Sequence, residues 1–205
     1  GEFDTSEDED SDERFFQYGR FFGIGVGSGY TAPTGNAGKL YQGSTPMIDF
    51  RLAYWFDFHW ALQIGVQNST HSYNVKPDGL TDVNLFRTLL QMRYYFDTHD
   101  LAAPLTFIGP NLIGGVGFYQ RTDNIGAGDA NSATANSIDS QNAFGLNFGA
   151  GLELTIKPKK VFLQFETMAH MIQFRDNLSP KFKAAGIPDR TGMWMVAGVS
   201  LLWAW

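Results

Sequence analysis

The sequence has no cysteine, no long apolar run and few basic residues. Without cysteine, the chain cannot form disulfides, thiolate zinc sites or thiol nucleophiles. It lacks any stretch of about 18 apolar residues, which excludes a membrane-spanning helix. Lysine and arginine total 15 against 21 acidic residues, for a net charge of −6. That balance argues against a nucleic-acid partner, which requires clustered basic residues.

Aromatic residues (15%) and glycine (23 of 205 residues) are abundant. The mean hydropathy of −0.19 is low, but the strands of a membrane barrel alternate apolar and polar side chains and average out in the same way. Acidic residues concentrate in 1–14, and a like-charged run with few large apolar groups predicts a disordered tail there. Its first letters, GEF, are interpreted as a possible cloning remnant. Residues 15–205 are expected to form a single domain.

Apolar residues recur at every second position in eight segments, which is the period of a β-strand. These segments are 20–30, 47–56, 60–67, 85–96, 105–119, 143–156, 161–174 and 193–205. The connections alternate between long polar ones (31–45, 71–82, 120–142, 175–189) and shorter ones (57–59, 97–104, 157–160). A convincing helical period is absent. The pattern predicts an all-β fold, an eight-stranded antiparallel up-and-down β-barrel.

The polar face of these segments indicates which side of the barrel is outside. It consists largely of glycine, with Asn, Gln and a few charges. A soluble, lipocalin-like barrel would expose this face to water, where glycine weakens a strand and packs against nothing. In the crowded interior of a small barrel, glycine fits well. The apolar face is therefore predicted to meet lipid, which makes the barrel a transmembrane one.

Aromatic residues cluster near both ends of the predicted strands, which predicts two girdles at the membrane interfaces. The set beside the short connections is Trp55, Phe56, Phe58, Trp60, Tyr94, Tyr95, Phe96, Phe107, Phe162, Trp203 and Trp205. The set beside the long connections is Tyr30, Tyr41, Tyr73, Phe118, Tyr119, Phe144, Phe174 and Trp194.

Two stretches, AFGLNFGAGLEL (143–154) and LLQMRYYFD (89–97), resemble strands of the small outer-membrane barrels of the OmpA, OmpX and OmpW type. The last segment is similar to the carboxy-terminal signal that the outer-membrane assembly machinery recognises. Its alternate apolar residues are Val199, Leu201, Trp203 and Trp205, with Trp where that group usually has Phe. The resemblance implies residence in the outer membrane of a Gram-negative bacterium. It also implies contact with lipopolysaccharide and phospholipid, and the assembly machinery as a partner.

The inward-facing positions collect charged residues, for which we predict a lumen ion-pair network. Its members are Asp49, Arg51, Arg87, Arg93, Glu153 and Glu166. Buried charges must be paired, so three arginines are expected to meet three carboxylates. The interior of an eight-stranded barrel is just wide enough for side chains. This favours a plugged lumen over the alternative, a gated pore lined by the same charges.

Catalytic and cofactor sites are not predicted. Ser69, His71 and Asp82 could form a Ser–His–acid set for acyl transfer, as in barrels that modify lipid A. Ser69 and His71, however, point into the lumen, away from lipid acyl chains. His170 and Glu166 share a face but are too far apart for a metal site, so His170 is interpreted as a packed lumen residue. Phosphate loops and zinc spacings are missing from the sequence, and no metal or cofactor is expected.

Three functions remain open. The favoured one is a structural or lipid-organising barrel that self-associates, because small residues interrupt its outer face and permit close approach in lipid. These residues are Thr88, Pro110, Gly114, Thr167 and Ala169. The second is a channel for small or hydrophobic solutes. The third is surface recognition through the long connections, above all the small polar stretch 123–142.

Overall fold

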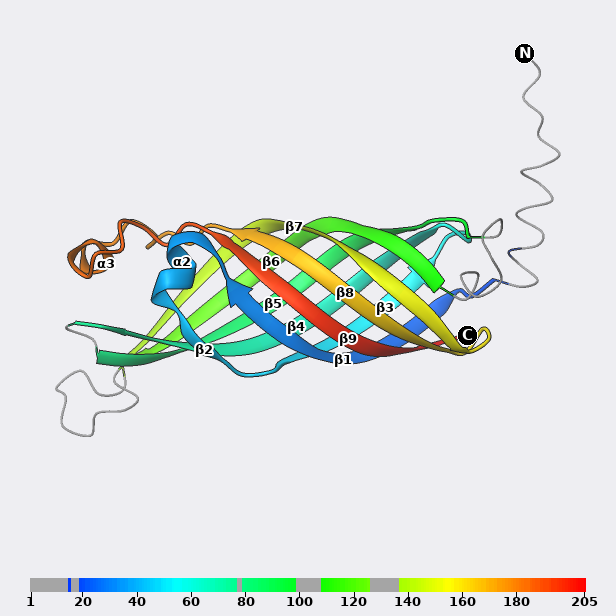
Figure 1. Cartoon of the computed structure of the whole chain (residues 1–205), viewed down its shortest axis with the longest axis horizontal. Coiled ribbons are helices and arrows are strands. Elements are labelled where there is room, and N and C mark those ends of the chain that lie inside the picture. Colours follow the sequence, from blue (N-terminus) through cyan, green and yellow to red (C-terminus); the bar gives the residue numbers. More distant parts are fainter. Residues whose placement is uncertain (1–14, 16–18, 77–78, 99–107, 126–136) are drawn as a thin grey trace, which may run out of the picture.

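Eight antiparallel strands form a closed barrel in the computed structural model, which describes residues 15, 19–76, 79–98, 108–125 and 137–205 (Figure 1). The barrel strands are β1 (Phe22–Pro33), β3 (Met47–Trp55), β4 (Trp60–Val75), β5 (Gly79–Tyr95), β6 (Ile108–Ile125), β7 (Ser137–Lys157), β8 (Val161–Ile172) and β9 (Met193–Ala204). β1 pairs with both β3 and β9, and β4 pairs with β5, which closes the ring. The predicted fold is confirmed. The predicted tail 1–14 lies outside the described residues.

The two faces of the wall differ as predicted. Along β3, buried and exposed residues alternate without interruption. Ile48, Phe50 and Leu52 are exposed on the outside, while Asp49 and Arg51 are buried in the lumen. An apolar exterior around a polar interior is the arrangement of a membrane barrel, and it is the reverse of a soluble lipocalin-like one.

The strands differ in length, and this makes the wall uneven. β4 to β7 have 16 to 21 residues, whereas β1, β3, β8 and β9 have 9 to 12. About 9–11 residues suffice for a transmembrane strand. The long strands therefore continue past the others at the end that carries the long connections, which we call the long-loop end (Figure 1).

This extension corrects two predicted connections. The stretch 71–82 is mostly paired strand, with β4 and β5 in register as far as Val75 and Gly79. Within 120–142, β6 and β7 are paired as far as Ile125 and Ser137. Above the membrane the outer face no longer needs to be apolar, so the apolar alternation that identifies a strand fades before the strand ends.

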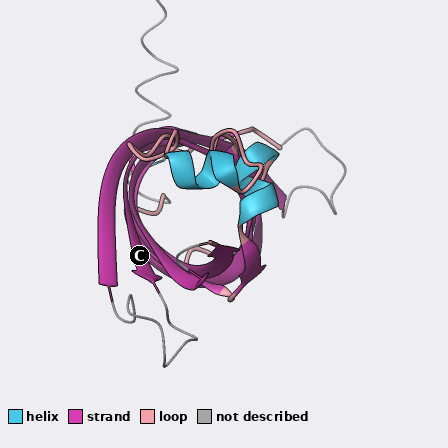
Figure 2. Ribbon diagram, turned by 90° about the vertical axis from the view of Figure 1, so that its left-hand side faces the viewer, coloured by secondary structure: helices cyan, strands magenta, loops and turns pink. Residues whose placement is uncertain are grey.

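Two short helices were also not predicted. α2 (Gly35–Leu40) and α3 (Pro180–Ala184) have 6 and 5 residues, too few to show a helical period. The three-residue strand β2 (Gln42–Ser44) pairs with β4 beyond the end of β3. Figure 2 shows both helices lying across the rim of the barrel. No helix in the described part of the chain is long and apolar enough to cross a bilayer.

Inward-facing glycines let the interior pack closely. A Cβ at Gly115 would lie 2.2 Å from the carbonyl oxygen of Leu90. At Gly117 and Gly145 it would lie 2.7 Å and 3.0 Å from the ring of Tyr119. The tyrosine thus reaches from β6 across β7 because both strands lack side chains beneath it. The crowded interior expected from the glycine pattern is present.

Candidate functional site: the barrel lumen

Four charged side chains meet in the lumen near the short turns, and we call them the ion-pair cluster: Asp49, Arg51, Arg93 and Glu166. Arg51 donates from Nε to Asp49 Oδ2 at 2.8 Å, and its Nη1 pairs with Glu166. Arg93 pairs with the same Glu166 oxygen and donates to Gln63 Oε1 at 2.8 Å. Their side chains are at most 9% exposed. The structure brings these four of the six listed lumen residues together.

Glu153 is also in the lumen, but its ion-pair partner was missed. Arg20, which precedes β1, places Nη1 2.6 Å from Glu153 Oε1. Its guanidinium lies 4.2 Å from the ring centroid of Trp55 and 4.3 Å from that of Phe162. Such cation–π contacts stabilise a desolvated arginine. The three arginines and three carboxylates predicted for the lumen balance, so Glu153 did not call for a further partner. Arg20 also has the parity of the outward-facing residues Phe22 and Ile24, and the strand period therefore does not place it in the lumen.

Three residues of the segment before β1 form what we call the inner plug: Phe15, Arg20 and Phe21. Phe15 is buried, and its ring centroid lies 5.1 Å from that of Phe21 and 5.2 Å from that of Phe58. The Phe21 carbonyl accepts a hydrogen bond from the Trp55 amide at 3.0 Å. The chain before the barrel thus packs into the lumen at the short-turn end.

Arg87 departs from the predicted network. It is fully buried, but no carboxylate of the described residues lies within ion-pair distance of its guanidinium. Its hydrogen bonds go to the hydroxyls of Thr31 and Ser69 at 3.3–3.4 Å. The register sets Arg87 beside Gln67 on one side and Tyr119 on the other. The strand period identified its face correctly, but not its height in the barrel, and height determines its partners.

A second ionic cluster, which the sequence reasoning missed, lies at the long-loop end. Arg121 places Nε 2.8 Å from Asp123 Oδ1 and Nη2 2.5 Å from Asp176 Oδ2. Arg190 also pairs with Asp176, and Tyr73 donates to Asp123 at 3.2 Å. Arg121 and Asp123 fell inside a stretch expected to be a polar connection. Only the continuation of β6 places them inside the lumen.

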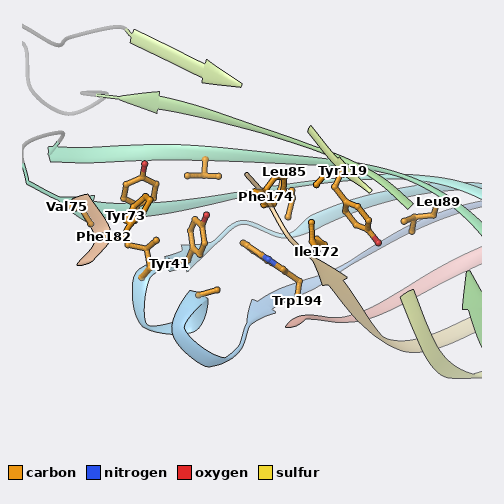
Figure 3. Close-up of a cluster of buried hydrophobic side chains, with 14 residues drawn as sticks. Tyr41, Tyr73, Val75, Leu85, Leu89, Tyr119, Ile172, Phe174, Phe182 and Trp194 are labelled. Atoms are coloured by element: carbon orange, nitrogen blue, oxygen red, sulfur yellow. The ribbon is translucent and has the colours of Figure 1, made fainter. Parts of the chain in front are cut away.

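Apolar side chains close the same end, and we call the combination of α2, α3 and residues 173–192 the outer cap. Figure 3 shows Tyr41, Tyr73, Phe182 and Trp194 gathered with aliphatic residues of the wall. Phe182 of α3 is fully buried, and Arg190 stacks 4.3 Å from its ring centroid. The cap therefore places a hydrophobic layer across the mouth, with the ion pairs of Arg121 and Arg190 beside it.

The predicted aromatic girdles are only partly correct. Three residues near the short turns point into the lumen: Trp55, Tyr95 and Phe162. Five near the long-loop end do the same: Tyr41, Tyr73, Tyr119, Phe174 and Trp194. The exposed ones are Phe56, Phe58, Trp60, Phe96, Trp203 and Trp205 at one end, and Tyr30, Phe118 and Phe144 at the other. Tyr94 is half-buried, and Phe107 lies outside the described residues. Closeness to a strand end sets the level of a residue, whereas the strand period sets its face.

The residues considered for catalysis do not form a triad. Ser69 Oγ and His71 Nε2 are 3.3 Å apart in the buried lumen. Asp82 is the cross-strand neighbour of Ser72 in the register of β4 and β5. Its side chain therefore lies on the opposite face of the wall from that of His71. His170 is fully buried and shares a 2.9 Å hydrogen bond with the Tyr119 hydroxyl. It is a packed lumen residue, as predicted.

Outside the membrane-spanning segments, a half-buried aspartate links the loops of the outer cap by hydrogen bonds. Asp189 accepts hydrogen bonds from the Thr191 hydroxyl at 2.5 Å, from Asn36 Nδ2 at 3.0 Å and from the Thr191 amide at 2.9 Å. These donors lower the pKa of Asp189 to about 2. Its links between α2 and the loop after α3 are therefore retained at neutral pH and weaken only in strong acid.

A groove of about 610 Å³ opens on the outer wall where β8 ends beside the longer β7. Phe144, Leu146, Met171 and Met193 supply apolar walls. Asn177, which is 5% exposed, also borders the groove, and its amide Nδ2, which is buried behind the groove wall, has no hydrogen-bond partner. We call this the rim groove. It combines apolar walls with one buried amide donor, Asn177 Nδ2.

No protein-family model and no curated protein sequence matches the chain. Among solved structures, Neisserial surface protein A aligns with a TM-score of 0.59 at 13% identity, covering 90% of this chain and 97% of that one. A major outer membrane protein from Thermus thermophilus gives 0.57 at 11% identity, covering 90% and 99%. OprG from Pseudomonas aeruginosa gives 0.53 at 15% identity, covering 89% and 95%. The chain therefore has the fold and the apolar outer surface of small outer-membrane β-barrels, in agreement with the predicted location in the outer membrane.

Proposed function

We propose that this protein is a structural outer-membrane barrel with a closed lumen, which acts on the membrane through the lipid that it holds on its outer wall. The observation that carries the proposal is the filling of the lumen at successive levels. The inner plug and the ion-pair cluster occupy the short-turn end, and the outer cap occupies the other. In barrels of this kind the short turns are periplasmic. Solute would have to displace paired charges and a hydrophobic layer to pass.

The alternative function, a small-solute channel, makes the opposite prediction for electrical conductance. In planar lipid bilayers the purified protein is expected to give no stepwise currents, because the ion-pair cluster blocks the narrow interior. A large porin in the same bilayer serves as the positive control. Steady currents whose size changes in a Glu166→Gln variant would show conduction through the lumen and contradict the closed barrel.

The rim groove supports the lipid-holding part of the proposal. Its apolar walls match acyl chains, and Asn177 Nδ2, buried directly behind the wall, would gain an acceptor if a lipid carbonyl displaced the side chains that cover it. Satisfying a buried, unpaired donor is favourable. A membrane lipid with its chains along the wall and its linkage carbonyl at the rim fits both features.

Native mass spectra recorded while detergent is stripped in steps test this site. Wild-type protein is expected to retain lipid after detergent is lost. Gln173 is exposed at the groove, and Gln173→Trp should reduce the retained fraction several-fold by filling the space. Leu90→Trp, on a lipid-facing position of β5 away from the groove, is the matched control. A lipid-free wild type, or equal loss in both variants, would rule out a specific lipid seat.

The same spectra report self-association. Thr88, Gly114 and Thr167 face outward and are exposed, in keeping with close approach by a neighbour, but Ala169 is shielded by the residues around it. Ala150, Thr167 and Ala197 are direct cross-strand partners and line a depression of about 410 Å³ on the outer wall. A single closed stoichiometry is the expected result if this depression seats a second barrel.

Two further expectations remain predictions. Val199, Leu201 and Trp203 lie on the exposed outer face of β9, and Trp205 directly after it is also exposed. The assembly machinery would have to bind these residues from that side. Surface recognition through the stretch 123–142 depends mainly on residues outside the described ones. We therefore place it after the structural role. The proposal includes no enzymatic activity.

A further inference from the structure

The charges in the lower and middle lumen do not balance. Arg51 and Arg93 are matched by Asp49 and Glu166, and Arg20 is matched by Glu153. Arg87 makes a fourth guanidinium against three carboxylates, so the described lumen residues carry one surplus positive charge at this level. Asp49 is the carboxylate that acts on Arg87 at longer range, but its bonds go to Arg51. An unpaired buried charge is costly, and native proteins neutralise it.

The hydrogen bonds of Arg87 are also incomplete. Its contacts with Thr31, Ser69 and the sulfur of Met47 are all 3.3–3.4 Å long and involve neutral atoms. Its Nε has no partner. A charged donor ordinarily makes shorter and stronger bonds than these. The guanidinium is therefore positioned by the barrel but not satisfied by it.

Two more donors without a hydrogen-bond partner lie in the middle of the lumen, next to the residues that surround Arg87. Tyr119 is the cross-strand neighbour of Arg87 and bonds His170 Nδ1 at 2.9 Å. When the hydroxyl donates to Nδ1, the proton of the imidazole is on Nε2, and Nε2 has no partner. Asn147 is the cross-strand neighbour of His170, and its amide is directed at the Tyr119 hydroxyl without completing a hydrogen bond of normal geometry, so its Nδ2 still has donors to offer. The Arg87 charge acts on the same imidazole.

From this arrangement we infer that the middle of the lumen binds a small monovalent anion of the chloride class. Arg87 Nε, Asn147 Nδ2 and His170 Nε2 are its donors. The anion neutralises the surplus charge and accepts from groups that have no acceptor within the barrel. All three residues are at least 98% buried, so the ion is part of the folded interior. The inference does not depend on the proposed function, because a closed structural barrel and a conducting one would both need the charge balanced.

Bromide identifies the site directly. Crystals of the wild-type protein grown with bromide as the only halide should show an anomalous peak beside Arg87 Nε and Asn147 Nδ2. Anomalous peaks confined to the protein surface, with water in the middle of the lumen, would overturn the inference. This experiment needs no variant and therefore does not depend on whether a mutant folds.

Stability in solution gives a second readout. After refolding in chloride, the thermal midpoint should rise by about 3–5 °C for each tenfold increase in chloride above its Kd, relative to gluconate at equal ionic strength. Arg87→Gln should abolish this rise. Arg121→Gln, which removes a buried arginine that has its own carboxylates, should preserve it. If Arg87→Gln does not refold, Asn147→Ala is used, with an expected loss of about tenfold or more in chloride affinity. Equal midpoints of the wild type in chloride and gluconate would contradict the site.

Discussion

Replacing Glu166 with leucine is expected to lower the free energy of unfolding by about 3–5 kcal/mol, the usual cost of removing one partner from a buried ion pair. Glu166 is the carboxylate shared by Arg51 and Arg93. Arg51 keeps Asp49 in the variant, but Arg93 loses the only described carboxylate within ion-pair distance. Urea titration of the refolded barrel in lipid vesicles, followed by tryptophan fluorescence, measures the change.

A double variant distinguishes the loss of the ion-pair attraction from the cost of leaving Arg93 buried without a carboxylate. Arg93→Leu/Glu166→Leu removes one charge of each sign and leaves the pair of Arg51 with Asp49 intact. The double variant leaves no new unpaired guanidinium in the lumen. It should therefore be more stable than Glu166→Leu alone. A loss below about 1 kcal/mol in the single variant would mean that water screens the cluster, and the lumen would then be open rather than closed.

Replacing Gly115 with valine should lower the free energy of unfolding by about 1–3 kcal/mol, the usual cost of overpacking a filled interior. Even a Cβ at this position would lie 2.2 Å from Leu90 O and 2.8 Å from the Cα of Gln91, both backbone atoms. Relief requires β5 and β6 to separate locally. The measurement is the same urea titration.

Gly114→Val is the matched control for this substitution. Gly114 is the preceding residue of β6 and faces outward, and a Cβ there would meet nothing within 4 Å. Its effect on the free energy of unfolding should stay within about 0.5 kcal/mol, as for most surface changes. Similar losses in both variants would show that the strand disfavours a branched side chain at either face, and that the interior is not closely packed at Gly115.

The proposed closed lumen would change where function is to be sought. Side chains held by ion pairs and by apolar packing lie at both ends of the described barrel, an arrangement that favours rigidity over transport. The outer wall, in contrast, has a rim groove with an unpaired amide donor and a depression over small residues. We therefore propose lipid, or a second barrel in lipid, as the partner of this surface.

Residue positions along the strands predict part of the site, and they also predict some inward-facing residues that were assigned to the aromatic girdles. The strand period that places Asp49 and Arg51 inward also places Trp55 inward, so the partial failure of the aromatic girdles was avoidable. Arg20 and Arg190 could not be found in this way, because neither belongs to a strand. Arg121 was hidden because its part of β6 lies beyond the apolar alternation.

The sequence by itself determined that strands form, which face of each one meets lipid, and that the interior holds charge, because a period of two is a local property of the chain. Only the tertiary structure decided which charges meet. Height in a barrel depends on the register of all eight strands together. This is why Arg93 forms an ion pair with Glu166, Glu153 forms one with Arg20, and Arg87 has no described carboxylate within ion-pair distance. The outer cap was likewise decided in three dimensions, since short helices gain their stability from the apolar mouth that they cover rather than from any pattern of their own.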